Sequence, residues 1–370
     1  MREILKKSRR IVIKAGTSIL TGKDGKISNR NLERLGLDIL ALRKQKKEVV
    51  LVSSGAIAFG MEALDRSDRP KEMPELQACA AIGQGRMMHA YEKFFSAKKV
   101  LTAQILLTRD GLEARPRFLA ARRTFHELFA RKVLPIVNEN DTVTTEEIAF
   151  GDNDILSVHV AHLVGADLLV VLSDVDGFYL KDGSRIRDVD SEAEIDGKLV
   201  RHLRDTRKAK TVGGMGAKLK AARVSMGLGV PLMIVNGHEA GIVDKALKGQ
   251  DVGTLFFPSG KGKSAREKWI AYSAARCGAL RVDEGAYEAL KSKNKSLLAS
   301  GIVKTSGAFK RGDVVELESK DGRIFGRGLT HYSSLELEKI AGKKSHEIQQ
   351  ILGYKLQDEV IHRNDLVVWG

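Results

Sequence analysis

Short apolar segments alternate with helical patterns through residues 10–258, and this alternation limits the folds open to the chain. The segments with the composition of strands are 10–14, 48–52, 133–137, 167–172 and 231–237. The segment 167–172 (DLLVVL) is apolar almost throughout, as expected of a strand that is covered on both faces. Helical patterns lie between these segments, such as 29–47, in which Leu32, Leu35, Ile39 and Leu42 share one face. The sequence therefore predicts an α/β fold with a mostly parallel sheet and helices on both faces.

The rest of the chain has a different pattern. The polar stretch that ends at Lys210 predicts irregular structure, and the polar segment 258–269 predicts a linker. After it come short strand-like segments separated by glycines: GALRVD (278–283), VVEL (314–317) and DLVVW (365–369). This pattern predicts a small, mainly β domain at the C-terminus.

Composition excludes several classes of protein. No apolar run reaches the roughly 20 residues that span a bilayer. Cys79 and Cys277 are the only cysteines, so a disulfide framework is excluded, and the basic N-terminus leads into the first strand without a signal region. We therefore expect a cytoplasmic protein. The net charge of +15 is spread over the chain, which favours a cationic surface that attracts anionic substrates over a dedicated nucleic-acid domain.

Polar residues gather where the predicted strands end and helices begin. Asn138–Asp141 (NEND) follows the segment 133–137, and residues 151–154 (GDND) lead into a helical pattern. Ligands of open α/β sheets bind at the carboxyl ends of strands, and this mixture of amides and carboxylates suits a small ligand with both an ammonium and a carboxylate. Asn and Asp also cap helices and form turns, and this alternative stays open for Asp152 taken alone.

Three turns of small residues are candidates for binding phosphate or another anion. Lys14 ends the first predicted strand, and the tight turn at 15–18 would let backbone N–H groups approach phosphate oxygens. The corner at 53–58 and the glycines of 212–218 (VGGMGAK) each precede a helix, whose dipole attracts anions. For the corner, plain helix capping by serine is the alternative.

Five motifs taken together resemble the glutamate 5-kinases, which have the amino acid kinase fold. They are VIKAGTS (12–18), SSGAI (53–57), NEND (138–141), GDND (151–154) and GGM (213–215). The fold is shared with acetylglutamate, aspartate, carbamate and uridylate kinases, and the pair NEND and GDND indicates the glutamate 5-kinases among them. The resemblance implies an amino acid kinase domain at 1–260 with a three-layer α/β/α sandwich, a linker at 261–276, and a PUA domain at 277–370 with a small, mainly β barrel.

The resemblance also implies a reaction. The γ-phosphoryl group of ATP would pass to the side-chain carboxylate of L-glutamate, giving L-glutamyl 5-phosphate and ADP, the first step of proline synthesis. A carboxylate with a pKa of about 4.3 is already ionised at pH 7, so no general base is needed and catalysis depends on positioning and charge neutralisation. Lys14 and Lys218 would neutralise the phosphates, and Asp154 would hold both lysines. Mg²⁺ would accompany ATP, with no residue expected to bind it directly.

Further site residues follow from the matching motifs. The amino acid would be bound by Ser54, Gly55, Ala56, Asn138, Asp141 and Asn153, with Asp141 paired to the ammonium. ATP would be bound by Lys14, Gly16, Ser173, Asp174, Val212, Gly213, Gly214, Met215, Gly216, Ala217 and Lys218. Val212 and Ala217 stand where the family usually has hydroxyl-bearing residues, so contacts with ATP at these two positions would come from the backbone.

Two alternatives remain. One is an RNA-binding PUA protein with a regulatory kinase-like domain, and the other is a related kinase acting on another amino acid or on a carbamate. Lys14, Lys218, Asp154 and Asp141 are all present, which favours a kinase. RNA is not an expected partner, because the tail lacks the interleaved aromatic residues of single-strand binders. We expect inhibition by L-proline, a homo-oligomer (dimer or tetramer), and functional coupling to glutamyl phosphate reductase.

Overall fold

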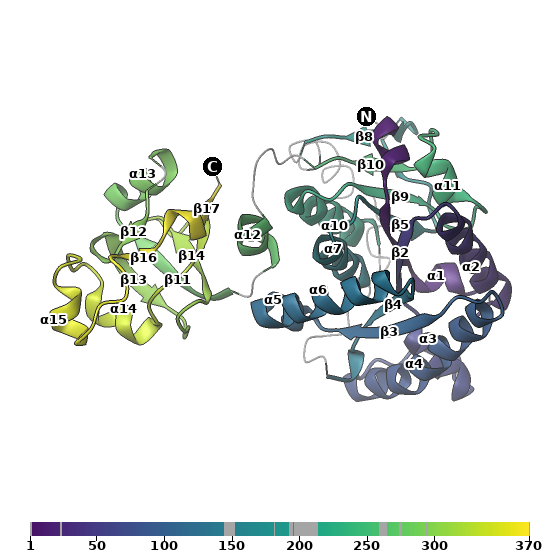
Figure 1. The fold of residues 1–370 in the computed structure, drawn as a ribbon. Helices are drawn as coiled ribbons and strands as arrows, with labels where there is room; N and C mark the ends of the chain where they lie inside the picture. Colours follow the sequence, from purple (N-terminus) through teal and green to yellow (C-terminus); the bar gives the residue numbers. More distant parts are fainter. Residues whose placement is uncertain are drawn as a thin grey trace. The chain divides into compact units, whose positions relative to one another are not determined.

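The computed structural model describes most of the chain in two compact units (Figure 1). The described residues are 2–22, 24–143, 152–180, 182–191, 195, 214–258, 265–273, 276–293 and 295–369. The first unit comprises Met1–Leu112 and Pro116–Gly260, and the second comprises Glu113–Arg115 and Lys261–Gly370. No helix among the described residues is both long enough and apolar enough to cross a membrane.

The first unit is built on an eight-stranded sheet in the order β3-β4-β2-β1-β5-β9-β10-β8. Its strands are β1 (Arg10–Ala15), β2 (Glu48–Ser53), β3 (Thr102–Leu107), β4 (Leu134–Glu139), β5 (Leu168–Ser173), β8 (Asp188–Val189), β9 (Leu232–Asn236) and β10 (Thr254–Phe256). The strands from β3 to β9 in that order are all parallel, and β10 pairs antiparallel with β9. The predicted mostly parallel sheet is confirmed.

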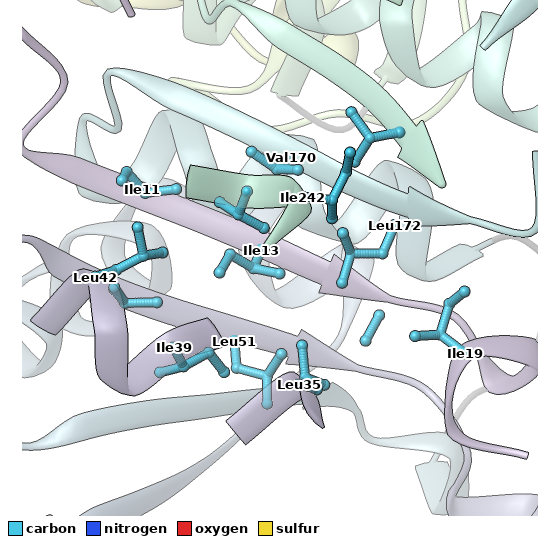
Figure 2. Close-up of a cluster of buried hydrophobic side chains, with 14 of the residues drawn as sticks. Ile11, Ile13, Ile19, Leu35, Ile39, Leu42, Leu51, Val170, Leu172 and Ile242 are labelled. Atoms are coloured by element: carbon cyan, nitrogen blue, oxygen red, sulfur yellow. The ribbon is translucent and has the colours of Figure 1, made fainter. Parts of the chain in front are cut away.

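Helices cover both faces of this sheet, as Figure 1 shows. The helices of this unit are α1 (Thr17–Leu20), α2 (Asn29–Lys44), α3 (Ala56–Ala63), α4 (Met73–Ser96), α5 (Arg109–Glu113), α6 (Arg115–Ala130), α7 (Asp152–Val164), α10 (Met215–Leu228) and α11 (Ile242–Leu247). Ile11 and Ile13 of β1 belong to a buried cluster with Leu35, Ile39 and Leu42 of α2 (Figure 2). Because side chains alternate along a strand, the residues next to these isoleucines lie on the opposite face, where α7 packs.

Helices α3 and α4 cross with their backbones in contact. A Cβ atom added at Gly60 would lie 1.9 Å from the carbonyl oxygen of Cys79, and one added at Gly83 would lie 1.8 Å from that of Ala56. Only glycine leaves room for this approach. The crossing fixes α4 against the start of α3, which is also the end of the turn that follows β2.

The polar stretch after β5 differs from the sequence-based expectation where the structure describes it. Irregular structure was predicted after Tyr179 and up to Lys210, but β7 (Arg185–Ile186) pairs antiparallel with β6 (Phe178–Tyr179), and β8 joins the main sheet beside β10. Arg2 stabilises this edge: its guanidinium donates to Asp188 and to the carbonyl groups of Arg187 and Val252. Such short strands are held by long-range contacts, so they leave no periodic pattern in the sequence.

The second unit contains a five-stranded sheet in the order β13-β11-β14-β15-β17 and a two-stranded sheet, β12-β16. The strands are β11 (Arg276–Val282), β12 (Leu297–Leu298), β13 (Ile302–Ser306), β14 (Val314–Glu318), β15 (Ile324–Leu329), β16 (Glu359–Ile361) and β17 (Leu366–Val368), with helices α13 (Glu284–Ser292), α14 (Ser334–Ile340) and α15 (Ile348–Leu352). The pairings are antiparallel except that of β11 with β14. The three segments predicted as strands lie in β11, β14 and β17.

Part of the predicted linker 261–276 is folded. Residues Ala265–Lys268 form α12, and Trp269–Ser273 form a turn of π-helix, η5. Arg327 of β15 donates from Nη1 to the carbonyl oxygen of Ala271 at 2.7 Å. Trp269 is buried. These contacts tie η5 to the second unit, so this part of the predicted linker is packed.

Candidate functional site

The carboxyl ends of the parallel strands meet at one edge of the first sheet and bring the predicted motifs together. β1 leads into Gly16, β2 into Ser54, β4 ends at Glu139 just before Asp141, and β5 leads into Asp174. The registers of β1 with β2 and with β5 place these ends side by side. This edge is where ligands of open α/β sheets bind.

Two lysines and one aspartate form an ion cluster at this edge. Lys14 Nζ lies 2.6 Å from Asp154 Oδ1, and Lys218 Nζ lies 3.8 Å from Asp154 Oδ2. The side chains of Lys14, Asp154 and Lys218 are only 7%, 1% and 11% exposed. Asp154 lies in the first turn of α7, where the helix dipole stabilises a carboxylate. Two cations held by one anion leave a net positive charge that a polyphosphate can neutralise.

The surroundings of Lys218 affect its affinity for a proton. Burial lowers the pKa of Lys218, and the neighbouring ammonium of Lys14 lowers it further. The carboxylates of Asp154 and Asp174 act in the opposite direction and raise the pKa. The charge state of this lysine therefore depends on the carboxylates beside it.

Two glycine turns present backbone groups next to these lysines. A Cβ atom at Gly16 would lie 3.3 Å from Lys14 Nζ, so the backbone at this position borders the ammonium group directly. Gly55 has φ +114°, in the left-handed region that favours glycine, and it is the N-cap of α3. The first N–H groups of α3, beginning at Ala56, have no partner within the helix and are suited to bind an anion.

A chain of hydrogen-bonded side chains runs behind these turns. Asn153 Nδ2 donates to Ser54 Oγ at 2.8 Å and to Asn138 Oδ1 at 3.0 Å. Asn138 Nδ2 in turn donates to Gln84 Oε1 of α4 at 2.8 Å. We call these four residues the amide chain. The structure thus joins residues from the ends of β2 and β4, the start of α7 and the middle of α4.

The other predicted residues lie around this centre. Asp141 begins the short 3₁₀ helix η2 (Asp141–Val143), and its carboxylate is close enough to Arg69 to oppose the lowering of the Arg69 pKa by burial. Ser173 is buried at the end of β5 and its hydroxyl donates to Asp174 Oδ1 at 3.1 Å. Gly214 is the N-cap of α10, and the helix begins with Met215, Gly216, Ala217 and Lys218. Val212 and Gly213 lie outside the described residues, as does Gly151.

Comparison with known proteins identifies the family. Residues 9–236 match the model of the amino acid kinase family, and residues 278–352 match the PUA domain. A glutamate 5-kinase of Carboxydothermus hydrogenoformans is 45% identical over 372 residues, which cover 100% of both chains. One of Caldanaerobacter subterraneus subsp. tengcongensis is 45% identical over 362 residues, or 97% of each chain. The chain belongs to the glutamate 5-kinase family.

This membership confirms the predicted kinase class, the amino acid kinase fold of the first unit and the PUA assignment of the second. Among solved structures, a carbamate kinase of Giardia gives a TM-score of 0.49 at 19% identity, with coverage of 67% of this chain and 98% of that one. The roles of individual site residues stay predictions.

Sequence reasoning missed two residues of this glutamate 5-kinase site. Gln84 lies in no motif, and its signal is a polar residue at helical spacing from two buried residues of α4, four positions after Ala80 and three before Met87. Tyr91 is fully buried on the same helix, and its hydroxyl lies 2.8 Å from Ser53 Oγ, beside the corner that leads to α3. Burial raises the pKa of Tyr91, so the phenol stays neutral.

Proposed function

We propose that this chain transfers the γ-phosphoryl group of ATP to the side-chain carboxylate of L-glutamate and so forms L-glutamyl 5-phosphate. The observation that carries the proposal is the buried Asp154 carboxylate between Lys14 and Lys218, at the same sheet edge as a chain of amides. The names of the relatives and the five sequence motifs point to the same reaction.

The two lysines neutralise the negative charge of the reacting groups. The attacking carboxylate and the triphosphate are both anionic, so their approach is opposed unless charge is neutralised. Lys14 and Lys218 supply that charge, and Asp154 keeps both ammonium groups in place before the substrates arrive. The glutamate carboxylate is ionised at neutral pH, so no side chain has to remove a proton. Catalysis consists of positioning two anions at one cationic centre.

The amide chain and the turns bind the amino acid. Ser54, Asn138 and Asn153 hydrogen-bond the polar groups of the amino acid, and Asp141 provides the counter-charge for the ammonium. The N–H groups of Gly55 and Ala56 hold the side-chain carboxylate for attack, and Gly16 contacts the transferring phosphoryl group. These assignments rest on the shared sheet edge and on the positions of the motifs.

ATP is bound on the other side of the ion cluster. Ser173, Asp174 and the residues at the start of α10 line this side, with Lys218 in the first turns of that helix. Among the described residues no group of three or more His, Cys, Asp or Glu could hold a metal ion. We propose that Mg²⁺ accompanies ATP on its phosphate oxygens, where it neutralises part of their charge.

We propose further properties of this chain. Free L-proline, which has the ammonium and α-carboxylate of glutamate but no side-chain carboxylate, competes for the amino acid site without reacting. The chain forms a homo-oligomer. It passes its product to a glutamyl phosphate reductase, because an acyl phosphate hydrolyses readily in water. Cys79 and Cys277 are free thiols, which agrees with a cytoplasmic enzyme.

The assay of this proposal is ATP-dependent hydroxamate formation. Hydroxylamine traps an acyl phosphate as a coloured hydroxamate, and glutamate, aspartate and N-acetylglutamate are compared at equal concentrations. We expect product with glutamate and little with the other two, because aspartate is one methylene shorter and N-acetylglutamate has no ammonium. Equal or faster reaction with either of these would assign the chain to another substrate.

A further inference from the structure

Gln84 is the one member of the amide chain that lies outside every sequence motif. It is a half-buried residue of α4, next to the buried Gly83 and three positions before the buried Met87, and its Nε2 atom is buried. A buried glutamine amide is stable only if its polar groups are hydrogen-bonded. Its Oε1 accepts from Asn138 Nδ2, and the crossing of α3 and α4 at Gly83 brings it within this distance.

The hydrogen bonds of the amide chain have one direction. Because Gln84 takes up an N–H group of Asn138, the Oδ1 atom of Asn138 faces Asn153. Asn153 must then donate from Nδ2, both to Asn138 and to Ser54. Each amide fixes the orientation of the next one, so the orientation of the Gln84 amide determines which atom of Asn153 faces Ser54.

This direction decides what the site offers to a ligand. Asn153 Oδ1 remains an acceptor with no hydrogen-bond donor among the described residues. The Ser54 hydroxyl accepts from Asn153, and its own hydrogen is not used in any hydrogen bond described here. An ammonium needs an acceptor and a carboxylate needs a donor, so the observed direction suits both groups of an amino acid. The reversed direction would turn Asn153 to present N–H groups to the ammonium.

We propose that Gln84 is a positioning residue that sets the direction of the amide chain and thereby the selectivity for an amino acid with a free ammonium. The inference rests on the proposed function and adds to it a residue that acts through Asn138 and Asn153. Gln84 Nε2 is buried and has no acceptor among the described residues, which is unfavourable for stability. A purely structural role predicts that a substitution of Gln84 changes stability without a selective effect on the KM for glutamate.

The first test replaces the amide by an apolar side chain of the same size. Gln84→Met removes the acceptor of Asn138 Nδ2, so it is expected to lower the melting temperature and to raise the KM for glutamate about tenfold, with an unchanged KM for ATP. The control is Gln45→Met, because Gln45 donates to Asp244 at 2.9 Å just before β2 begins, at the opposite edge of the sheet. The control is expected to leave both KM values unchanged. An unchanged KM for glutamate in Gln84→Met, or a lower melting temperature with both KM values raised equally, overturns the proposal.

A second pair of variants tests whether the KM for glutamate depends on the direction of the hydrogen bonds or on the charge of residue 84. Gln84→Glu can only accept from Asn138 and keeps the direction, whereas Gln84→Lys can only donate and reverses it. We expect a lower KM for glutamate in Gln84→Glu than in Gln84→Lys. Charge alone predicts the reverse order, because glutamate is a net anion, and that order would overturn the proposal. If the wild-type protein itself makes no hydroxamate from glutamate, the proposed function fails, which is a separate result.

Discussion

The substitution Asp154→Asn tests the ion cluster most sharply. The carboxylate lies 2.6 Å from Lys14 Nζ and 3.8 Å from Lys218 Nζ, and all three side chains are nearly buried. At an effective dielectric constant of about 20, opposite unit charges about 4 Å apart attract each other by about 4 kcal/mol. Asp154→Asn removes this attraction and leaves two positive charges close together. If the attraction positions Lys218 in the transition state, its loss corresponds to roughly a thousandfold decrease in kcat.

The same substitution changes the pH dependence. Burial lowers the pKa of Lys218, and the Asp154 carboxylate opposes this effect. Without the carboxylate the pKa of Lys218 falls further, so the lysine loses its proton at a lower pH and the alkaline limb of kcat moves to lower pH. Above the folded-state pKa of Lys218 and below the ordinary value of 10.5, the unfolded chain binds more protons than the folded chain. The free energy of unfolding therefore rises with pH over this range, and the range is wider in the variant.

The measurement is hydroxamate formation from pH 6 to pH 10, with circular dichroism to verify folding. Asp188→Asn is the matched control, because Asp188 pairs with Arg2 Nε at 2.9 Å on β8, at the end of the sheet order. We expect it to leave kcat and the alkaline limb unchanged. A folded Asp154→Asn variant that keeps kcat within tenfold, with an unmoved alkaline limb, would refute the role of the cluster.

Four further predictions follow from the two units. Asp141→Asn is expected to raise the KM for glutamate by about 10- to 100-fold and that for ATP little, since a charged hydrogen bond contributes about 1.5–3 kcal/mol; equal changes in both would make Asp141 structural. L-Proline is expected to inhibit competitively with glutamate, and initial rates unaffected by millimolar proline at sub-saturating glutamate would contradict this. Burial alone would raise the pKa of Glu336, but hydrogen bonds from Arg311, Ser333 and Tyr354 outweigh it and hold the pKa at about 2. The wild-type melting temperature should therefore fall between pH 4.5 and pH 2, and Glu336→Gln should show a flatter profile; parallel profiles would exclude this network as the cause. Full-length protein is expected to bind RNA only weakly and to release it at physiological salt, whereas sub-micromolar, sequence-selective binding would favour the RNA-binding alternative.

The sheet could be predicted because buried parallel strands are continuous apolar runs. The segment 167–172 becomes β5 (Leu168–Ser173), shifted by one residue. The motifs at strand ends could be placed together for the same reason, since parallel strands bring their carboxyl ends to one edge. β6, β7 and β8 could not be predicted, because strands of two residues are too short to show a period of two.

The contacts that complete the site join residues far apart in the sequence, and local sequence patterns do not predict such contacts. Gln84 and Asn138 are 54 positions apart, and they meet because Gly60 and Gly83 let two helices touch. The two glycines and the glutamine are visible in the sequence, but the crossing of α3 and α4 that they permit is not. The folding of η5 has a similar origin, because its partner Arg327 lies in β15, more than 50 positions later in the chain.

The central claim is that the side-chain carboxylate of glutamate attacks the γ-phosphoryl group, and an oxygen isotope follows that step directly. Glutamate labelled with ¹⁸O in its side-chain carboxylate is incubated with ATP, Mg²⁺, hydroxylamine and the enzyme. Attack through a carboxylate oxygen makes that oxygen the bridge of the acyl phosphate, and hydroxylamine then breaks the bond between it and the carbonyl carbon. We predict that the released phosphate carries one ¹⁸O atom, seen in its ³¹P NMR signal or its mass. Phosphate without ¹⁸O, released as fast as ADP, would show that water is the acceptor and would contradict the proposed function.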